Sequence, residues 1–428
     1  MVFAQVLGAA VNRKLTALLA VLILLTAGGA GLVSSGERGR KRPRKSGKKA
    51  GKGAKKEPRK EPEKEPKKDK TDEERKLLAE MERRKGATFP GRDPAFLVLP
   101  RPGERSQMVK ELLTPEVKKM TREALEYLAR TQDTDGGWSD TQFQSNTGVT
   151  ALCCMAFMAE GSRPRIGKYG KHVNSGIEFL LKNVKKGSGV IAGKGSYQYG
   201  PMYEHALSTQ ALLLAWGDMP WKGDDIRKAL TGAVEALKKS QRQDGGWRYL
   251  VSNQGNSDMS VTANVLWVLR TAKKCGFTVR QASIDKGTNY IRKCALPDGT
   301  FRYRYWGLHA SPSLGGTGVI ALMNQGRIDH KLIPPARDRI AYDYRRYTIK
   351  DLKTRRYFVY GAFYASLATY SCGDKYWLPW HKKCAAVFKS MQREDGEFYD
   401  QDDNLVYPTA MAAIILQAPL GYLPIYER

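Results

Sequence analysis

Two kinds of helical segment alternate along the chain from about residue 114 to the end. The first kind is amphipathic: in residues 116–132, apolar side chains such as Val117, Met120 and Leu128 share one stripe, and the remaining surface is charged. The second kind is small and apolar nearly all round, which is typical of a helix buried on every side. Six segments of this second kind span residues 147–159, 203–216, 260–272, 316–324, 357–370 and 407–417. We therefore expect outer amphipathic helices packed around inner apolar ones.

A short turn motif punctuates these segments. The sequence QDTDGGW at residues 132–138 recurs as QRQDGGW at 241–247, more weakly as QREDGEF at 392–398, and as a trace, PDGTF, at 297–301. The aspartates Asp135, Asp244, Asp298 and Asp395 are 109, 54 and 97 positions apart, which are multiples of a unit of roughly fifty residues. Six helical hairpins of this kind can close on themselves. The pattern therefore predicts an all-α (α/α)6 toroid over residues 114–428.

Each residue of the motif has an expected structural role. Glycine allows the positive φ that a sharp turn after a helix requires. Aspartate accepts hydrogen bonds from nearby backbone amides, glutamine bridges to the adjacent turn, and the aromatic residue fills the gap between neighbouring hairpins. These roles fall to Gln132, Asp135, Trp138, Gln241, Asp244, Trp247, Asp395 and Phe398.

Helix starts can also be read from the sequence. We expect Thr114 to cap the first outer helix, with Pro115 at its first position. Asp224 or Asp225 is the expected cap of a later outer helix, and Ser283 that of another. Residues 333–349 form a short and irregular fifth unit in this interpretation, which makes it the weakest part of the ring.

The first 113 residues have a different composition. Residues 15–33 form an uncharged, mainly apolar run of 19 after Arg13 and Lys14, so residues 1–35 are either a signal peptide or a membrane anchor. Residues 36–70 have almost no apolar side chain and are expected to be a disordered basic linker. Residues 71–113 begin with a capping box at Thr71 and Glu74, which predicts a short helix followed by an irregular connector. We expect a membrane-anchored or exported protein, with the side of the membrane left open.

The formal net charge of +29 favours acidic partners. Between Glu37 and Lys70 there are 17 Lys and Arg against 6 Asp and Glu, so the linker can bind a membrane or an acidic envelope polymer, or act as a solvated spacer. The chain has no zinc-finger, helix-turn-helix or RNA-binding signature, so we expect no specific nucleic-acid partner. The six cysteines form no CxxC pair, and we expect buried thiols.

The motif and the apolar helices together resemble the prenyltransferase and squalene-cyclase repeat superfamily. The resemblance rests on Q-x-x-D-G-G-W and on segments such as YEHALSTQALLLAW and SVTANVLWVLR, and it covers residues 116–419. The chain resembles in particular bacterial repeat proteins that carry an N-terminal signal or anchor. It implies an (α/α)6 toroid with a central cavity, in a family whose enzymes handle isoprenoid chains or cyclise triterpenes.

The catalytic signatures of that superfamily are incomplete here. Squalene-hopene cyclases carry D-x-D-D-T-A at the head of an inner helix, whereas this chain reads DMSVTA at 258–263, with Ser260 at the place of the proton donor. The zinc-binding D-x-Y-H-T-C-Y segment of protein prenyltransferases would fall near residues 357–364, which contain no His or Cys. The resemblance therefore implies neither the usual acid nor a zinc site, and we expect no metal or cofactor.

The candidate site residues lie where inner helices begin. Glu204 and His205 could act as an acid–base pair, or could instead satisfy the amides of a helix start and a turn. Asp258 could be an acid or simply an N-cap. An expected ligand cavity is lined by Tyr203, Thr262, Trp306, His309, Tyr360, Tyr364 and Tyr407, with Asp140, Tyr303 and Tyr305 close by.

Three functions stay open at this point. The first is a divergent terpenoid-binding repeat protein that holds a hydrophobic or isoprenoid ligand in a central cavity. The second is an active isoprenoid enzyme with a displaced acid. The third is a carbohydrate-active α/α toroid that uses carboxylates such as Glu204 and Asp258.

Overall fold

The structure is a computed structural model that describes residues 111–141, 144–193, 200–323 and 331–426. All of these residues belong to one compact unit. The apolar run at 15–33, the basic linker and the helix expected after Thr71 lie outside the described residues. No helix within the described residues has both the length and the hydropathy needed to cross a bilayer.

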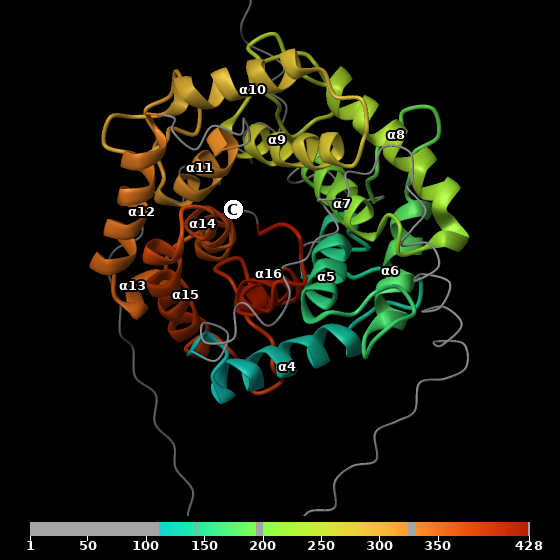
Figure 1. Cartoon of the computed structure of the whole chain (residues 1–428), viewed down its shortest axis with the longest axis horizontal. Helices are drawn as coiled ribbons and strands as arrows, with labels where there is room; N and C mark the ends of the chain where they lie inside the picture. The colour runs from blue at the N-terminus through green and yellow to red at the C-terminus, as the bar shows by residue number, and fades with distance from the viewer. Residues whose placement is uncertain (1–110, 142–143, 194–199, 324–330, 427–428) are drawn as a thin grey trace, which may run out of the picture. The chain divides into compact units, whose positions relative to one another are not determined.

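Helices of this unit form two concentric layers in the described ranges, as Figure 1 shows. The outer layer consists of α4 (Pro115–Arg130), α6 (Gly170–Lys182), α8 (Gly223–Lys239), α10 (Gln281–Cys294), α12 (Ile333–Arg346) and α15 (Asp374–Lys389). The inner layer consists of α5 (Thr147–Glu160), α7 (Pro201–Ala215), α9 (Met259–Lys274), α11 (Gly315–Met323), α14 (Phe358–Ser371) and α16 (Val406–Gln417). The short α13 (Ile349–Lys353) lies just before α14. The predicted all-α toroid and its six apolar inner helices are confirmed.

The layers differ because their sequences differ. All the residues of α5 except the last are buried, and all of α9 up to Leu269 are buried as well. By contrast, the buried residues of α4 recur every three or four positions and leave its charged face outside. Each inner helix also packs against its inner neighbours, and α16 contacts both α4 and α5, so the ring is closed.

Some helix starts differ from the expected ones. Thr114 caps α4 as predicted, with its hydroxyl accepting from the Val117 amide at 3.2 Å. The predictions for α8 and α10 were wrong: α8 begins at Gly223, so Asp224 and Asp225 lie in its first turn. There they favour the positive end of the helix dipole rather than cap it. Ser283 likewise lies inside α10, which begins at Gln281.

The fifth unit is more regular than the sequence suggested. Its outer helix α12 runs for 14 residues, and a capping box formed by Thr348 and Asp351 starts α13 directly after it. Proline at the first turn is tolerated because no intrahelical hydrogen bond is lost there, and so the two prolines at 334–335 do not break α12.

The aromatic residue is fixed in the same way in three of the four turn motifs. Its side chain is fully buried, and its backbone amide donates to a threonine hydroxyl in the following inner helix. These bonds join Trp138 to Thr150 at 2.9 Å, Trp247 to Thr262 at 2.9 Å, and Phe398 to Thr409 at 2.8 Å. The indole N–H groups of the two tryptophans also donate to carbonyl oxygens of the preceding outer helix, at Leu128 and Leu237. The aromatic side chain therefore joins the two layers, as predicted.

The two glycines of the motif serve different purposes. Only the first has a positive φ, +91° at Gly136 and +95° at Gly245. The second is required for space, because a Cβ at Gly137 would lie 2.7 Å from the Phe179 ring. The expectation that the pair supplies positive φ is thus correct for one position of the two.

The glutamine of the motif links consecutive outer helices. Its side-chain N–H₂ group donates to the glycine carbonyl of its own turn and to a carbonyl at the next outer helix. The second bond runs from Gln132 to His172 at 3.1 Å and from Gln241 to Ser283 at 2.8 Å. In the last motif, Gln392 donates to Met120 of α4 at 2.9 Å. This bond closes the ring between the last hairpin and the first.

We expect Trp247→Ala to destabilise the fold by about 3–5 kcal/mol, because it leaves a cavity between the two layers and removes the indole hydrogen bond. Thermal and urea unfolding would measure the change. The matched control is Trp306→Ala, since the Trp306 side chain is 51 % exposed and its loss should barely change the midpoint. Equal midpoints for the two variants would contradict a core role for Trp247.

Candidate functional site

The first turns of the inner helices meet at one end of the ring, which we call the mouth. Glu204 in the first turn of α7 contacts Thr147, the first residue of α5. Tyr203 in the same turn lies close to Ser260 of α9 and to Tyr360 of α14. The loops that precede the inner helices surround this mouth. The candidate acids and cavity residues fall on these loops or first turns, except Tyr364, which lies in the second turn of α14.

Glu204 acts as a cap for a neighbouring helix. Its Oε2 atom accepts from the Thr147 amide at 3.2 Å, from the Thr147 hydroxyl at 2.8 Å and from the Gly193 amide at 3.0 Å. A carboxylate at the start of α5 satisfies free amide groups and favours the helix dipole. The Oε2 atom of Glu204 is therefore engaged in the scaffold, and a catalytic role for this residue stays a prediction.

His205 points away from Glu204, toward the outer layer. Its Nδ1 accepts from the Ile191 amide at 3.0 Å, which leaves the proton on Nε2 to be donated to the Ala233 carbonyl at 3.1 Å. Burial lowers the pKa of His205 to about 4, so the ring is neutral at pH 7. The two residues do not form the acid–base pair that their adjacency suggested, because neighbouring helix positions point about 100° apart.

Of the two roles considered for Asp258, the N-cap is confirmed and the acid stays a prediction. Its Oδ1 atom accepts from the Val261 amide at 3.0 Å and from the Ser260 hydroxyl at 2.7 Å, so it is the N-cap of α9. Its Oδ2 atom is buried and has no hydrogen-bond partner among the described residues. Burial raises the pKa of this carboxyl above its usual value, against the opposing effects of its hydrogen bonds and of Arg248. One oxygen of Asp258 is thus available to a ligand.

Tyrosines surround this carboxyl. The hydroxyl groups of Tyr249 and Tyr303 lie 2.5 Å apart, and Tyr203 and Tyr360 complete the group. Burial raises the pKa of all four, so their hydroxyls stay protonated at neutral pH. The Tyr360 hydroxyl has no hydrogen bond of normal geometry within the described part of the chain. The aromatic side chains of Tyr360 and Tyr364 lie one turn apart on α14, with ring centroids 4.9 Å apart.

Three residues of the predicted cavity lie elsewhere. Thr262 faces the outer layer, where its hydroxyl holds the Trp247 amide and donates to the Asp258 carbonyl at 2.6 Å. Trp306 and His309 are exposed, on a hairpin closed by the bridge between Arg302 and Ala310. The prediction that Trp306 and His309 line the cavity was wrong because this hairpin projects from the mouth instead of folding into it.

The interior below the mouth is narrow. Trp267 of α9 reaches past α11 to pack edge-on against Phe363 and Tyr364 of α14, with ring centroids 6.1 and 6.4 Å apart. Small exposed fractions remain on the inward side chains Leu207 (7 %), Trp267 (5 %) and Ile320 (8 %). The interior along the ring axis is therefore narrow and partly filled by large aromatic side chains, and the expected central cavity stays a prediction.

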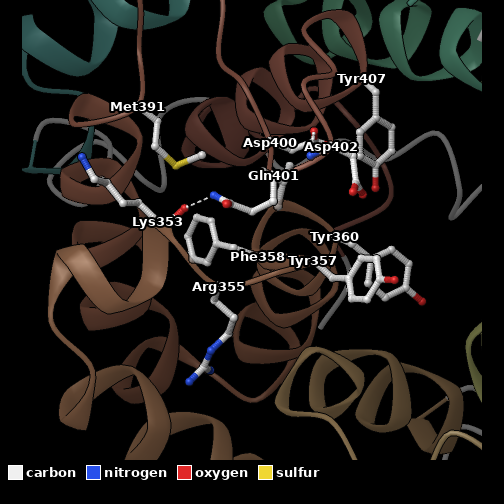
Figure 2. A pocket seen from close by; sticks show the side chains of 11 residues that line it. Lys353, Arg355, Tyr357, Phe358, Tyr360, Met391, Asp400, Gln401, Asp402 and Tyr407 are labelled. Atoms are coloured by element: carbon white, nitrogen blue, oxygen red, sulfur yellow. Dashed lines mark hydrogen bonds between the residues drawn. The ribbon is translucent and has the colours of Figure 1, made fainter. Parts of the chain in front are cut away.

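A pocket of about 360 Å³ opens at the mouth beside Tyr360. Figure 2 shows Tyr357 and Tyr360 at one side of it and Asp402 and Tyr407 at another. Gln401 crosses toward Lys353 and donates to its carbonyl at 2.8 Å. The remaining lining residues are Arg355, Phe358, Val359, Met391 and Asp400.

Backbone strain occurs at the edge of this pocket. Tyr357 is half exposed and has a φ of +62°, a conformation that costs free energy for a residue with a side chain. It was missed as a pocket residue, as were Asp400, Gln401 and Asp402. The signal for them was present: the loop after each motif aromatic leads to the mouth, and 399–405 is such a loop.

Asp140, another expected mouth acid, caps α16. Its two oxygens accept from the Leu405 amide at 2.8 Å and from the Tyr407 amide at 2.7 Å. Metal chemistry has no evident location in the described ranges, where no group of three or more His, Cys, Asp or Glu could hold an ion. Asp258 is thus the mouth carboxyl whose free oxygen lies among aromatic rings.

The raised pKa of Asp258 predicts a pH dependence of stability. The folded state keeps the Asp258 proton to a higher pH than the unfolded chain does. Wild-type stability therefore falls as pH rises from the pKa of Asp258 in the unfolded chain to its pKa in the folded state, and then levels off. Asp258→Asn keeps the cap acceptor and removes the titration. We expect the melting temperature of Asp258→Asn, relative to wild type, to rise between pH 4 and pH 7.

Scanning fluorimetry across this range measures the difference. Asp258→Ala is the control, since it also lacks the carboxyl but loses the cap as well, at a cost of about 1 kcal/mol. A difference between wild type and Asp258→Asn that does not change with pH would contradict the raised pKa.

Comparisons with solved structures support the fold alone. A cellobiose 2-epimerase from Bacillus thermoamylovorans is 16 % identical, with 71 % of this chain and 98 % of that chain covered and a TM-score of 0.51. An α-1,6-mannanase from Salegentibacter is 10 % identical, with 72 % and 99 % covered and a TM-score of 0.53. A type II terpene cyclase from Scytonema is 13 % identical, with 72 % and 100 % covered and a TM-score of 0.48.

Sequence comparison identifies the family. No curated protein matches the chain. The profile of the family described as prenyltransferase alpha-alpha toroid domain matches residues 106–194 and 174–334, which together make up more than half of the 428 residues. Both matches contain turn motifs whose glutamine, aspartate and aromatic side chains form the contacts described above. The chain belongs to the prenyltransferase alpha-alpha toroid domain family.

Proposed function

We propose that the mouth of the ring binds an isoprenoid or a similarly hydrophobic ligand. The observation that carries this proposal is the free oxygen of Asp258, a desolvated carboxyl beneath tyrosine rings. The faces of aromatic rings suit an unsaturated hydrocarbon and stabilise nearby positive charge. A carboxyl that keeps its proton can donate a hydrogen bond or a proton to what lies on those rings.

The proposal places the ligand at the mouth instead of in a wide centre. A pocket opens to solvent beside Tyr360, whereas Trp267 and Tyr364 narrow the axis below. Asp258 takes the place of the acids that squalene cyclases carry in the same segment, which favours an enzyme with a displaced acid. An anchored or exported location, inferred from residues 15–33, is part of this proposal and would bring the protein to a lipid source.

A carbohydrate is the second candidate ligand, and one observation favours it. The pocket in Figure 2 combines Asp402 and Gln401 with the rings of Tyr357 and Tyr407, and such polar and aromatic groups suit a sugar. The epimerase and the mannanase that share the fold act on sugars by their names. Against this candidate, three donors already hold the Oε2 atom of Glu204, so Glu204 could act only through its other oxygen.

Direct binding measurements separate the two candidates. We expect farnesol to raise the melting temperature of the protein and to quench its tyrosine and tryptophan fluorescence, and cellobiose to do neither. Tyr360→Ala should weaken farnesol binding about tenfold, the effect of losing about 1.4 kcal/mol of contact. The control is Tyr342→Ala, because Tyr342 is exposed on the outer helix α12.

The carbohydrate candidate makes the opposite prediction. Binding of cellobiose or α-1,6-mannotriose that is lost in Asp402→Asn and Tyr407→Ala, together with no response to farnesol, would overturn the isoprenoid proposal.

A further inference from the structure

Two side-chain amides are buried in the ring below the mouth. Gln210 on α7 and Asn264 on α9 are both fully buried. Neither the oxygen nor the nitrogen of either amide has a hydrogen-bond partner among the described residues. A buried amide without a partner costs the fold free energy, so two of them on neighbouring helices require an explanation.

Both amides point toward the ring axis. On α7, Tyr203 and Gln210 are seven residues apart and so share the face opposite to His205, which contacts the outer helix α8. On α9, Ser260 and Asn264 are four residues apart and lie opposite to Leu266, against which Gly287 of α10 packs. The amides therefore border the narrow axial gap.

The register of the two helices places the amides near each other. Tyr203 and Ser260 lie close together, so the first turns of α7 and α9 are at about the same level. Gln210 then lies about 10 Å below that level and Asn264 about 6 Å below it, at 1.5 Å per residue. Packed helix axes are about 8–10 Å apart, so two extended side chains can reach one small molecule between them.

Further unpartnered hydroxyls connect the amides to the mouth. Thr317 on α11 and Tyr360 on α14 each have a buried hydroxyl without a hydrogen bond of normal geometry in the described ranges. The free Oδ2 of Asp258 lies at the same upper level. Helices α7, α9, α11 and α14 thus carry polar groups without partners among the described residues. Side chains such as Leu207, Trp267, Ile320 and Tyr364 lie among them.

We propose that Gln210 and Asn264 form a second binding site, below the mouth, for a neutral hydroxyl group. An amide both donates and accepts hydrogen bonds and carries no charge, as does a hydroxyl, whereas an ion would gain little from it. The hydroxyl can belong to ordered water or to the alcohol end of a ligand that enters through the mouth. The site concerns residues that the proposed function does not use, and it stands whichever ligand the mouth binds.

The first test is the sign of a stability change. Gln210→Met and Asn264→Leu replace each amide by an apolar side chain of similar size. If a bound hydroxyl satisfies the amides, each variant lowers the melting temperature of the full chain; if the amides are unpartnered, each variant raises it. Leu207→Met on the same face is the control for packing alone. A rise or no change in both amide variants, relative to Leu207→Met, would overturn the proposal.

The second test identifies the source of the hydroxyl in the wild-type protein. Farnesol and farnesyl methyl ether share one chain, but only the alcohol can donate a hydrogen bond. A larger thermal shift with farnesol, abolished in Asn264→Leu, assigns the site to the ligand alcohol. If farnesol and farnesyl methyl ether give equal thermal shifts, or none, and both amide variants have lowered melting temperatures, the bound hydroxyl is assigned to water. In the case of no shift, the proposed isoprenoid function fails while this site stands.

Discussion

The hydrogen bonds of the Gln392 side chain join the last hairpin of the ring to the first, and the burial of every inner helix depends on that closure. Gln392 donates to its own turn at Gly396 and to Met120 of α4, and Gly396 lies so close to the Glu123 carbonyl that a Cβ there would be 2.6 Å away. A helix such as α16, apolar all round, is stable in water only if neighbours cover it on every side. The bond itself is modest, but it fixes the register in which α4 and α5 cover α16.

Closure also explains how the carboxylates at the mouth are used. Six helix starts converge there, and their free amide groups need acceptors. Glu204 serves α5 and Asp140 serves α16, each from a neighbouring hairpin, whereas Asp258 serves its own helix α9. Acids that look available for chemistry in the sequence are therefore mostly part of the scaffold. Asp258 differs because the oxygen that its cap leaves unused is buried and lies among tyrosines.

The repeat made the fold predictable, since each turn motif names its own contacts: a glycine with positive φ, an aromatic core residue and a bridging glutamine. The site was less predictable because its contacts join different repeats. The partner of Glu204 is 57 residues away, and His205 meets Ala233 of an outer helix, so neither environment can be read from local spacing. Tyr203 and Tyr360 were found because first turns of inner helices lead to the mouth. The similar prediction for Trp306, in the loop before α11, was wrong because its hairpin turns outward.

The bond between Gln392 and Met120 spans 272 positions of sequence, and this separation has a consequence for how the chain folds. Hairpins form from local contacts and can assemble one after another during synthesis. The surface of α4 that receives Gln392, however, stays uncovered until nearly the whole chain has left the ribosome. An open arc of hairpins with two apolar ends therefore precedes the ring, and two such arcs can complete each other. During folding, closure by the last hairpin therefore competes with pairing between two copies, and the speed of closure matters as well as its strength.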